Sequence, residues 1–339
     1  MQHEIVTPGE LLDETGNLAQ RGWMRNLLLR YDRARIKAPQ FMIKEWDYYC
    51  IMGGDAGLAL TVADNGYLAM GSVTLFDFTV PKEDSKSVMA PFPLGKLGMP
   101  PSSQEGDVRF AQNGMNLTFT KRGTERRLSV HVKHFKDGKP LEGELVLHQP
   151  EDIESMVIAT PFHKARRFYY NQKINCMPAT GELRLGDKTT TFGREPAFGV
   201  LDWGRGVWTY RNTWYWGSAS GLVDGVPFGF NIGYGFGDTS AASENVLFYR
   251  GKAHKIDQVI FHIPPDDFLK PWRFSSSDGR FEMTFEPVLD RASDTNVLLI
   301  RSNQHQVFGR FSGKAVLDDG ETIVLDRFPG FAEKVANRW

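Results

Sequence analysis

The stretch from Phe168 to Trp216 decides the fold of this 339-residue chain and holds its main candidate site. It contains Tyr169-Tyr170-Asn171, Gly186-Asp187-Lys188, Leu201-Asp202-Trp203-Gly204-Arg205-Gly206-Val207-Trp208 and Trp214-Tyr215-Trp216. The pattern indicates a β-hairpin that leads to an acid among indoles and arginines. A carboxylate beside large apolar rings either pairs with a cation or holds its proton unusually tightly, and either state can serve chemistry.

Hairpin signals recur along the rest of the chain. Asn-Gly and Asp-Gly pairs supply the positive φ of tight turns, and they occur at Asn65-Gly66, Asp137-Gly138, Asp224-Gly225, Asp278-Gly279 and Asp319-Gly320. Between two of these turns, Phe281, Met283 and Phe285 alternate on one face, as in a half-buried strand. Residues 307–313 form a second candidate strand. These patterns predict an all-β fold.

Helical periodicity is scarce in this sequence. The best candidate for a helix is the amphipathic, basic stretch from Arg21 to Arg33, which also fits an extended arm. A chain of 339 residues exceeds what one hydrophobic core usually organises. We therefore expect two β-barrel-like domains, residues 1–160 and residues 161–339.

Composition and charge exclude several classes of protein. The chain has 40 Lys and Arg against 41 Asp and Glu, so no net field favours nucleic acid or an anionic membrane. No secretory signal and no apolar run long enough to span a bilayer occur, so we expect a cytoplasmic protein. Cys50 and Cys176 are expected to be buried thiols. The sequence contains no Cys/His cluster with zinc spacing, so we expect no structural metal site.

The central stretch is similar to a signature of the carotenoid 1,2-hydratase (hydroxyneurosporene synthase) and AttH-like superfamily. The matching residues are Tyr169-Tyr170-Asn171, Gly181-Glu182-Leu183, Gly199 and Asp202-Trp203-Gly204. The chain departs from the signature in two ways, because Asn171 replaces the usual Ser and Asp202 directly precedes Trp203. Over its whole length, the chain resembles a bacterial family of unknown function, at residues 43–49, 203–216, 302–309 and 337–339.

The resemblance implies a fold and a style of reaction. The fold is two lipocalin-like (calycin-like) β-barrel domains packed together. The reaction is one in which acids near Asp202 protonate or polarise an unsaturated ligand without a metal or a redox cofactor. The departures from the signature leave the type of reaction open.

Asp202 is the first candidate for a catalytic residue. Against Trp203 and Trp208, its carboxyl could keep a raised pKa and act as a general acid. The alternative is a structural ion pair with Arg205 or Arg211. We expect the carboxyl to be buried among aromatic rings near the interface of the two halves.

Other candidates for catalysis and for ligand binding lie elsewhere in the sequence. Glu244, Glu45 and His305 are further candidates for catalysis, although Glu45 could instead pair with Lys44 or Arg35, and Glu244 could be a strand-end acid in solvent. A lone histidine is also more often structural. The candidates for ligand binding are Trp203, Trp208, Trp214, Trp216, Tyr170, Asn231 and Arg205. For the tryptophans, plain core packing is an equally good explanation.

These residues support three hypotheses on function. The first is a cofactor-independent, acid-catalysed enzyme that hydrates, cyclises or isomerises an apolar, unsaturated, isoprenoid- or polyketide-like ligand. The second is a non-catalytic protein that binds a small apolar or amphipathic ligand, such as a lipid or an isoprenoid. The third is a carbohydrate-active enzyme with paired carboxylates. We expect Trp214, Trp216, Asn231 and Glu244 to line one cavity in the C-terminal half.

Overall fold

The fold consists almost entirely of antiparallel β-strands. The computed structural model describes residues 2–193, 196–297 and 300–338, so Trp339 of the terminal motif lies outside the described residues. Within these ranges there is no α-helix, and two short 3₁₀ turns, η1 (Arg33–Arg35) and η2 (Gln40–Met42), are the helical elements. The predicted all-β class is confirmed.

The first sheet has 13 strands and curls into a nearly closed barrel. Its hydrogen-bonded order is β7 (Lys82–Pro91), β6 (Leu68–Asp77), β5 (Ala56–Asp64), β4 (Lys44–Gly53), β15 (Ala197–Val207), β13 (Phe168–Leu185), β11 (Lys139–His148), β10 (Glu125–Lys136), β9 (Met115–Arg122) and β8 (Asp107–Gln112). Off this path lie β12 (Met156–Pro161), β2 (Gly22–Met24) and β14 (Lys188–Phe192). The edge strands β7 and β8 come into contact, and Lys136 on β10 pairs with Asp84 on β7 at 2.6 Å.

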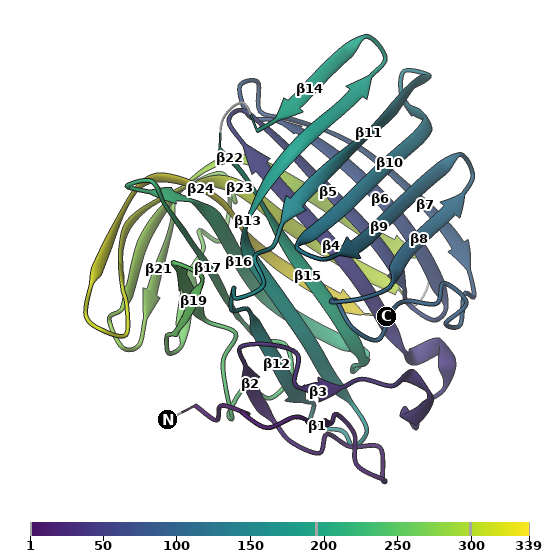
Figure 1. Ribbon diagram of the computed structural model, residues 1–339, viewed down its shortest axis with the longest axis vertical. Coiled ribbons are helices and arrows are strands. Elements are labelled where there is room, and N and C mark those ends of the chain that lie inside the picture. The colour runs from purple at the N-terminus through teal and green to yellow at the C-terminus, as the bar shows by residue number, and fades with distance from the viewer. Residues whose placement is uncertain (1, 194–195, 298–299, 339) are drawn as a thin grey trace.

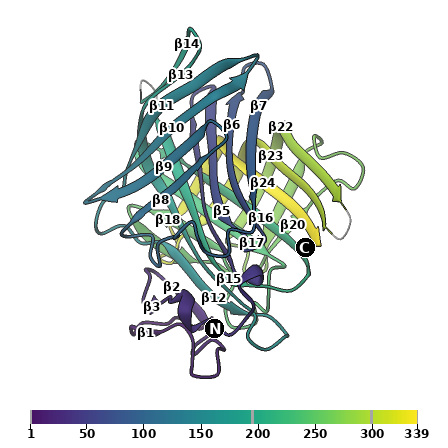
Figure 2. The same ribbon diagram turned by 90° about the vertical axis from the view of Figure 1, so that its right-hand side faces the viewer.

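The second sheet has nine strands and forms a half-barrel. Its order is β19 (Lys252–Lys255), β18 (Val246–Tyr249), β17 (Val226–Tyr234), β16 (Arg211–Val223), β24 (Thr322–Arg338), β23 (Ile300–Val316), β22 (Phe281–Val297), β21 (Trp272–Ser276) and β20 (Val259–His262). Figures 1 and 2 show this sheet, with its yellow-green strands β22–β24, curving away from strands β8–β11 of the first. Two lipocalin-like barrels are therefore confirmed as the architecture.

The chain passes from the first sheet to the second between Val207 and Arg211. The boundary predicted near residue 160 falls in β12, and the long strands β13 and β15 that follow it pair within the first sheet. Division of the chain into folding units at residue 160 stays a prediction.

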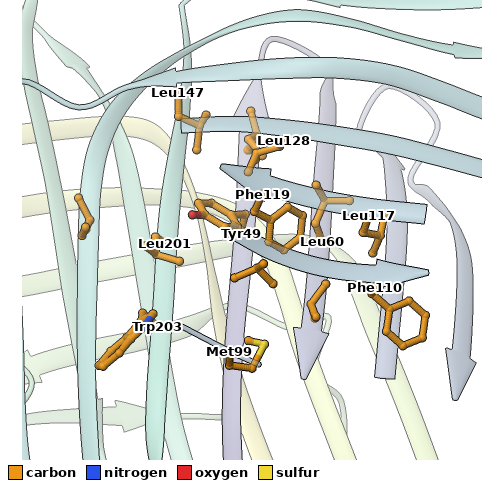
Figure 3. Packing of buried hydrophobic residues seen from close by; sticks show 14 of the residues in the cluster. Tyr49, Leu60, Met99, Phe110, Leu117, Phe119, Leu128, Leu147, Leu201 and Trp203 are labelled. Carbon is orange, nitrogen blue, oxygen red and sulfur yellow. The ribbon is translucent and has the colours of Figure 1, made fainter. Parts of the chain in front are cut away.

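Alternating side chains fill the core of the first barrel. Tyr49 from β4, and Leu201 and Trp203 from β15, point into one cluster with Leu117 and Phe119 from β9 (Figure 3). In the second sheet, Phe281, Met283 and Phe285 lie together in the core, as their spacing predicted. The predicted strands are confirmed, since residues 281–286 lie within β22 and residues 307–313 within β23, and Arg280 immediately precedes β22.

The stretch from Arg21 to Arg33 is not a helix, and the extended arm weighed as the alternative is what forms. It contains β2, which pairs with β12, and β3 (Leu29–Arg30), which pairs with β1 (Gly9–Glu10). Trp23 on β2 is buried in a cluster with Phe248, which belongs to β18 of the second sheet. Cross-strand pairing and burial of the indole thus override the helical pattern. The arm lies at the bottom of the molecule in both views (Figures 1 and 2).

Two further expectations concern single residues and membrane spans. Cys50 is buried, Cys176 is partly buried, and both thiols are free. No helix in the part of the chain that the structure describes is long and apolar enough to cross a membrane.

The two sheets pack through an apolar layer, which gives a direct test of the fold. Phe76 on β6 and Phe308 on β23 lie with their ring centroids 4.3 Å apart across the sheets. We expect the alanine variants of these two residues to lower the free energy of unfolding by about 3–5 kcal/mol each. In a double-mutant cycle, they should be non-additive by about 0.5–1.5 kcal/mol. Denaturant unfolding measures both the single-variant losses and the coupling. The control cycle combines Phe76→Ala with Phe230→Ala, which should be additive because Phe230 lies in the core of the second sheet. Additivity of Phe76 and Phe308 would contradict this packing.

Candidate functional site

A cavity of about 180 Å³ lies between the two sheets. The first sheet contributes strands β4, β5, β6, β13 and β15 to its walls, and the second contributes β16, β17 and β24. Its ring-bearing walls include Trp46, Tyr169, Trp208, Trp214, Trp216 and Phe236. Its charged lining residues are Lys173, Asp202, Glu244 and Glu333. The cavity therefore combines a broad apolar surface with three carboxyls and one ammonium group.

The aromatic wall is held by ring-to-ring contacts. Trp46 stacks on Tyr169 at 6.0 Å and meets Trp208 edge-on at 5.1 Å. Phe236 makes edge contacts with Tyr169 at 4.7 Å and with Trp214 at 5.2 Å. Such perpendicular pairs add specific stabilisation to area burial. The wall is therefore preorganised before any ligand arrives.

Glycine at position 204 makes room for this wall. A Cβ atom added to Gly204 would lie 2.0 Å from an indole carbon of Trp46. The Trp46 ring thus packs against the backbone of β15 at Gly204. Packing of the Trp46 ring therefore explains why position 204 is a glycine, in addition to the superfamily resemblance of Asp202-Trp203-Gly204.

Asp202 lies in the cavity wall, and its partner is Lys173. The Lys173 ammonium lies 2.9 Å from Oδ2 of Asp202, and Asn171 donates its side-chain N–H to Oδ1 at 2.5 Å. Lys173 is only 2% exposed and sits over the Trp216 ring, 3.9 Å from its centroid. The predicted pairing with Arg205 or Arg211 is wrong, because Lys173 on the neighbouring strand β13 takes that place.

Glu333 on β24 is the second acid of the cavity. Trp214 donates its indole N–H to Oε1 at 2.9 Å, and Gln306 donates to Oε2 at 3.1 Å. The residue is 4% exposed, and burial raises the pKa of its carboxyl from 4.5 to about 7, against the hydrogen bond from Trp214. A carboxyl with this pKa can both give and take a proton near neutral pH.

Glu244 is the third acid and has the fewest partners. It is 7% exposed, and no side chain among the described residues lies within ion-pair distance or donates a hydrogen bond to its carboxyl. Burial raises the pKa of Glu244, opposed by the charge of Lys173. This combination favours the protonated form.

Asn231 supports the cavity from behind its wall. It accepts the indole N–H of Trp216 at 2.7 Å and donates to the backbone oxygen of Glu244 at 2.9 Å. Trp214, Trp216 and Glu244 therefore face one cavity, as predicted, whereas Asn231 fixes two of them without lining it. The cavity lies between the sheets and not inside the C-terminal half alone.

Three predicted ligand-binding residues face away from the cavity. Trp203 points into the core of the first barrel (Figure 3), and Tyr170 donates its hydroxyl to the Leu29 backbone oxygen there. Arg205 pairs with Asp47 at 3.1 Å and is fully buried. Their assignment to the ligand site is wrong because neighbouring residues of a strand point to opposite faces.

Glu45 and His305 also lie elsewhere. Glu45 pairs with Arg33 at 2.5 Å and accepts the Tyr31 hydroxyl at 2.8 Å, so neither Lys44 nor Arg35 is its partner. His305 contacts Asp290 at 2.7 Å and stacks on Phe268 at 3.8 Å. Neither residue lines the cavity. Both therefore have structural partners in place of the predicted catalytic role.

Sequence reasoning missed Lys173 and Glu333. Each had a detectable signal, since a charged residue occupies an apolar position of an alternating strand. Glu333 follows Phe331 and precedes Val335 on one face, and Lys173 follows Tyr169 and Asn171 in a strand that is buried on both faces. A charge on a buried face is a candidate for function. Within the described ranges, no group of three or more His, Cys, Asp or Glu is arranged to hold a metal ion.

The raised pKa of Glu333 makes a prediction about stability. The folded state keeps a proton up to about pH 7, whereas the unfolded state releases it near 4.5. Unfolding therefore releases a proton in this window, and stability falls as the pH rises through it. We expect Glu333→Gln to remove this part of the fall, on the order of 3 kcal/mol between about pH 4 and about pH 8. Thermal unfolding of both proteins across this range measures it. Parallel curves for the variant and the wild type would contradict the assignment.

Comparison with solved structures finds matches at low sequence identity. A putative AttH from Nitrosomonas europaea is 13% identical, with a TM-score of 0.49 over 91% of this chain and 96% of that one. Kievitone hydratase from Nectria haematococca is 8% identical, with a TM-score of 0.49 over 98% of each chain. CghA with Sch210972 is 9% identical, with a TM-score of 0.44 over 97% of this chain and 96% of that one.

No curated protein matches the sequence. One family matches it over residues 2–339, under the description "Domain of unknown function (DUF2804)". This match confirms the full-length resemblance seen in the sequence, and the chain belongs to that family.

Proposed function

We propose that the protein is a cofactor-independent enzyme that uses acid catalysis on an apolar, unsaturated ligand bound between its two sheets. One observation carries the proposal. Glu244 and Glu333 line an aromatic-walled cavity and have no cation at ion-pair distance among the described residues, whereas the third carboxyl, Asp202, pairs with Lys173. A buried carboxyl that is kept neutral can deliver a proton at neutral pH.

The three acids have different roles in this proposal. Glu244 is the proton donor, because burial raises its pKa and no side chain in the described ranges donates a hydrogen bond to its carboxylate. Glu333, with a pKa of about 7, is the group that accepts a proton. Asp202 is assigned a positioning role, since it fixes the Lys173 ammonium against the Trp216 ring.

Hydration then balances in atoms and charge. The Glu244 proton is transferred to one carbon of a double bond, and water adds to the other carbon. The added water loses a proton to the Glu333 carboxylate. Glu244 then takes up a proton from solvent and Glu333 releases one, which restores the starting state. If Glu333 takes a proton from the ligand in place of water, the same pair isomerises or cyclises it.

The apolar ligand class follows from the wall. Eight aromatic residues line the cavity, and an empty apolar cavity of about 150 Å³ is large enough to bind benzene. A volume of about 180 Å³ therefore takes a ring or a branched end of a ligand. The isoprenoid- or polyketide-like class is the part of this proposal that the sequence resemblance suggests.

Labelled water tests the proposed chemistry. Ligands extracted from the purified protein, and a panel of isoprenoid and polyene alkenes, are incubated with it in D₂O that contains ¹⁸O. We expect mass spectrometry to find deuterium on carbon, with ¹⁸O as well if water adds. Glu244→Gln should lower the rate about 100-fold or more, because the amide cannot deliver the proton.

Glu286→Gln is the matched control, since Glu286 is an exposed acid on β22 that pairs with Arg327. It should leave the rate unchanged. Binding of ligand without isotope incorporation in the wild type would identify a binding protein, and the proposed catalysis would be wrong. Equal rates for Glu244→Gln and the control would exclude Glu244 as the proton donor.

A further inference from the structure

The charges around the cavity do not balance. Asp202, Glu244 and Glu333 face it, whereas Lys173 is the one cation among its described lining residues. That lysine is already engaged with Asp202 at 2.9 Å. Glu244 and Glu333 are left without an ion-pair partner among the described residues, and a cationic ligand could pair with their ionised forms.

The rings of the wall favour the same sign of charge. The faces of Trp and Tyr rings are negative, and they attract ammonium groups within about 6 Å of the ring centroid. The protein itself shows this contact, because the Lys173 ammonium lies 3.9 Å from the Trp216 centroid. Trp208 and Trp214 lie around the same cavity, and no Lys or Arg in the described part of the chain lies over either ring.

We infer that this cavity is a binding site for an organic cation, an alkylated ammonium group held between Trp208 and Trp214 and neutralised by Glu244 and Glu333. The inference goes beyond the proposed catalysis and does not require it. An amphipathic ligand would place its cationic end among the rings and extend the rest of its chain toward the opening. The same cage would also stabilise positive charge that develops on a ligand during proton transfer.

Two probes of the same shape but different charge distinguish a cation site from plain apolar binding. Choline and 3,3-dimethylbutan-1-ol have nearly the same size and branching, and they differ in the positive charge. An apolar cavity without charge preference would favour the neutral alcohol, since an ammonium loses hydration on entry. A cation cage favours choline by about tenfold or more. Isothermal titration and tryptophan fluorescence measure both dissociation constants.

Coupling to protons gives an independent readout. A bound cation favours the ionised carboxyls, so choline should release protons when it binds at about pH 7, and the alcohol should not. The charged groups that act on Glu333 are Lys173, Asp202 and Arg291, and those on Glu244 are Lys173, Asp202 and Lys255. Titration in buffers of different ionisation enthalpy counts the released protons.

A ring variant locates the binding. Trp208→Leu keeps an apolar side chain but removes the ring, and it should weaken choline about threefold to tenfold while the alcohol is little affected. Trp208→Phe should retain most of the affinity, and Glu286→Gln is the surface control. Unfolding temperatures check that each variant is folded.

Three outcomes would overturn the inference: no saturable binding of choline, equal or tighter binding of the alcohol, or equal loss of both probes in Trp208→Leu. If choline does not bind selectively but isotope is still incorporated, the cation site is wrong and the proposed catalysis is retained. Choline selectivity without isotope incorporation would leave the cation site and remove the catalysis.

Discussion

The alternation of side chains on β4, β13 and β15 is the constraint on which the rest of the structure depends. Each strand presents one face to the core of the first barrel and the other to the second sheet. On β15, Leu201 and Trp203 fill the barrel, while Asp202 faces the cavity. On β13, Tyr170 faces inward and Lys173 outward. The same strands therefore build a core and a functional wall, and a shift of one residue in register would exchange the two.

Packing of the second sheet onto that wall creates the chemistry. Before the sheets meet, the face with Asp202 and Lys173 would lie in water, where acids keep their ordinary protonation. Glu333 comes from β24 of the second sheet and Glu244 from the loop before β18, and enclosure removes water from both carboxyls. Burial then raises the pKa of both acids, while Lys173 neutralises Asp202. The pairing of one acid and the isolation of two others are thus products of the contact between the sheets.

The sequence predicted the elements better than the site. Alternation of Phe281 with Met283 identifies a strand because it is a local pattern, and hairpin turns are equally local. The pair Asp202 and Trp203 shows the limit, because both were assigned to the site although adjacent residues of a strand face opposite ways. Glu333 was missed because its neighbours in the cavity come from strands more than a hundred residues away in sequence, such as β13 and β15. Only tertiary packing brings them together.

Infrared spectroscopy of the carboxyl groups tests the central claim most directly. A protonated carboxyl has a C=O stretching band that ionisation removes, and ordinary surface acids are ionised well below neutral pH. We predict that the wild-type protein keeps this band at about pH 6, where Glu333 with its pKa of about 7 holds its proton, and that the double variant Glu244→Gln, Glu333→Gln loses it. A spectrum without the band at that pH, or a band unchanged in the double variant, would contradict the account of a cavity built around neutral acids.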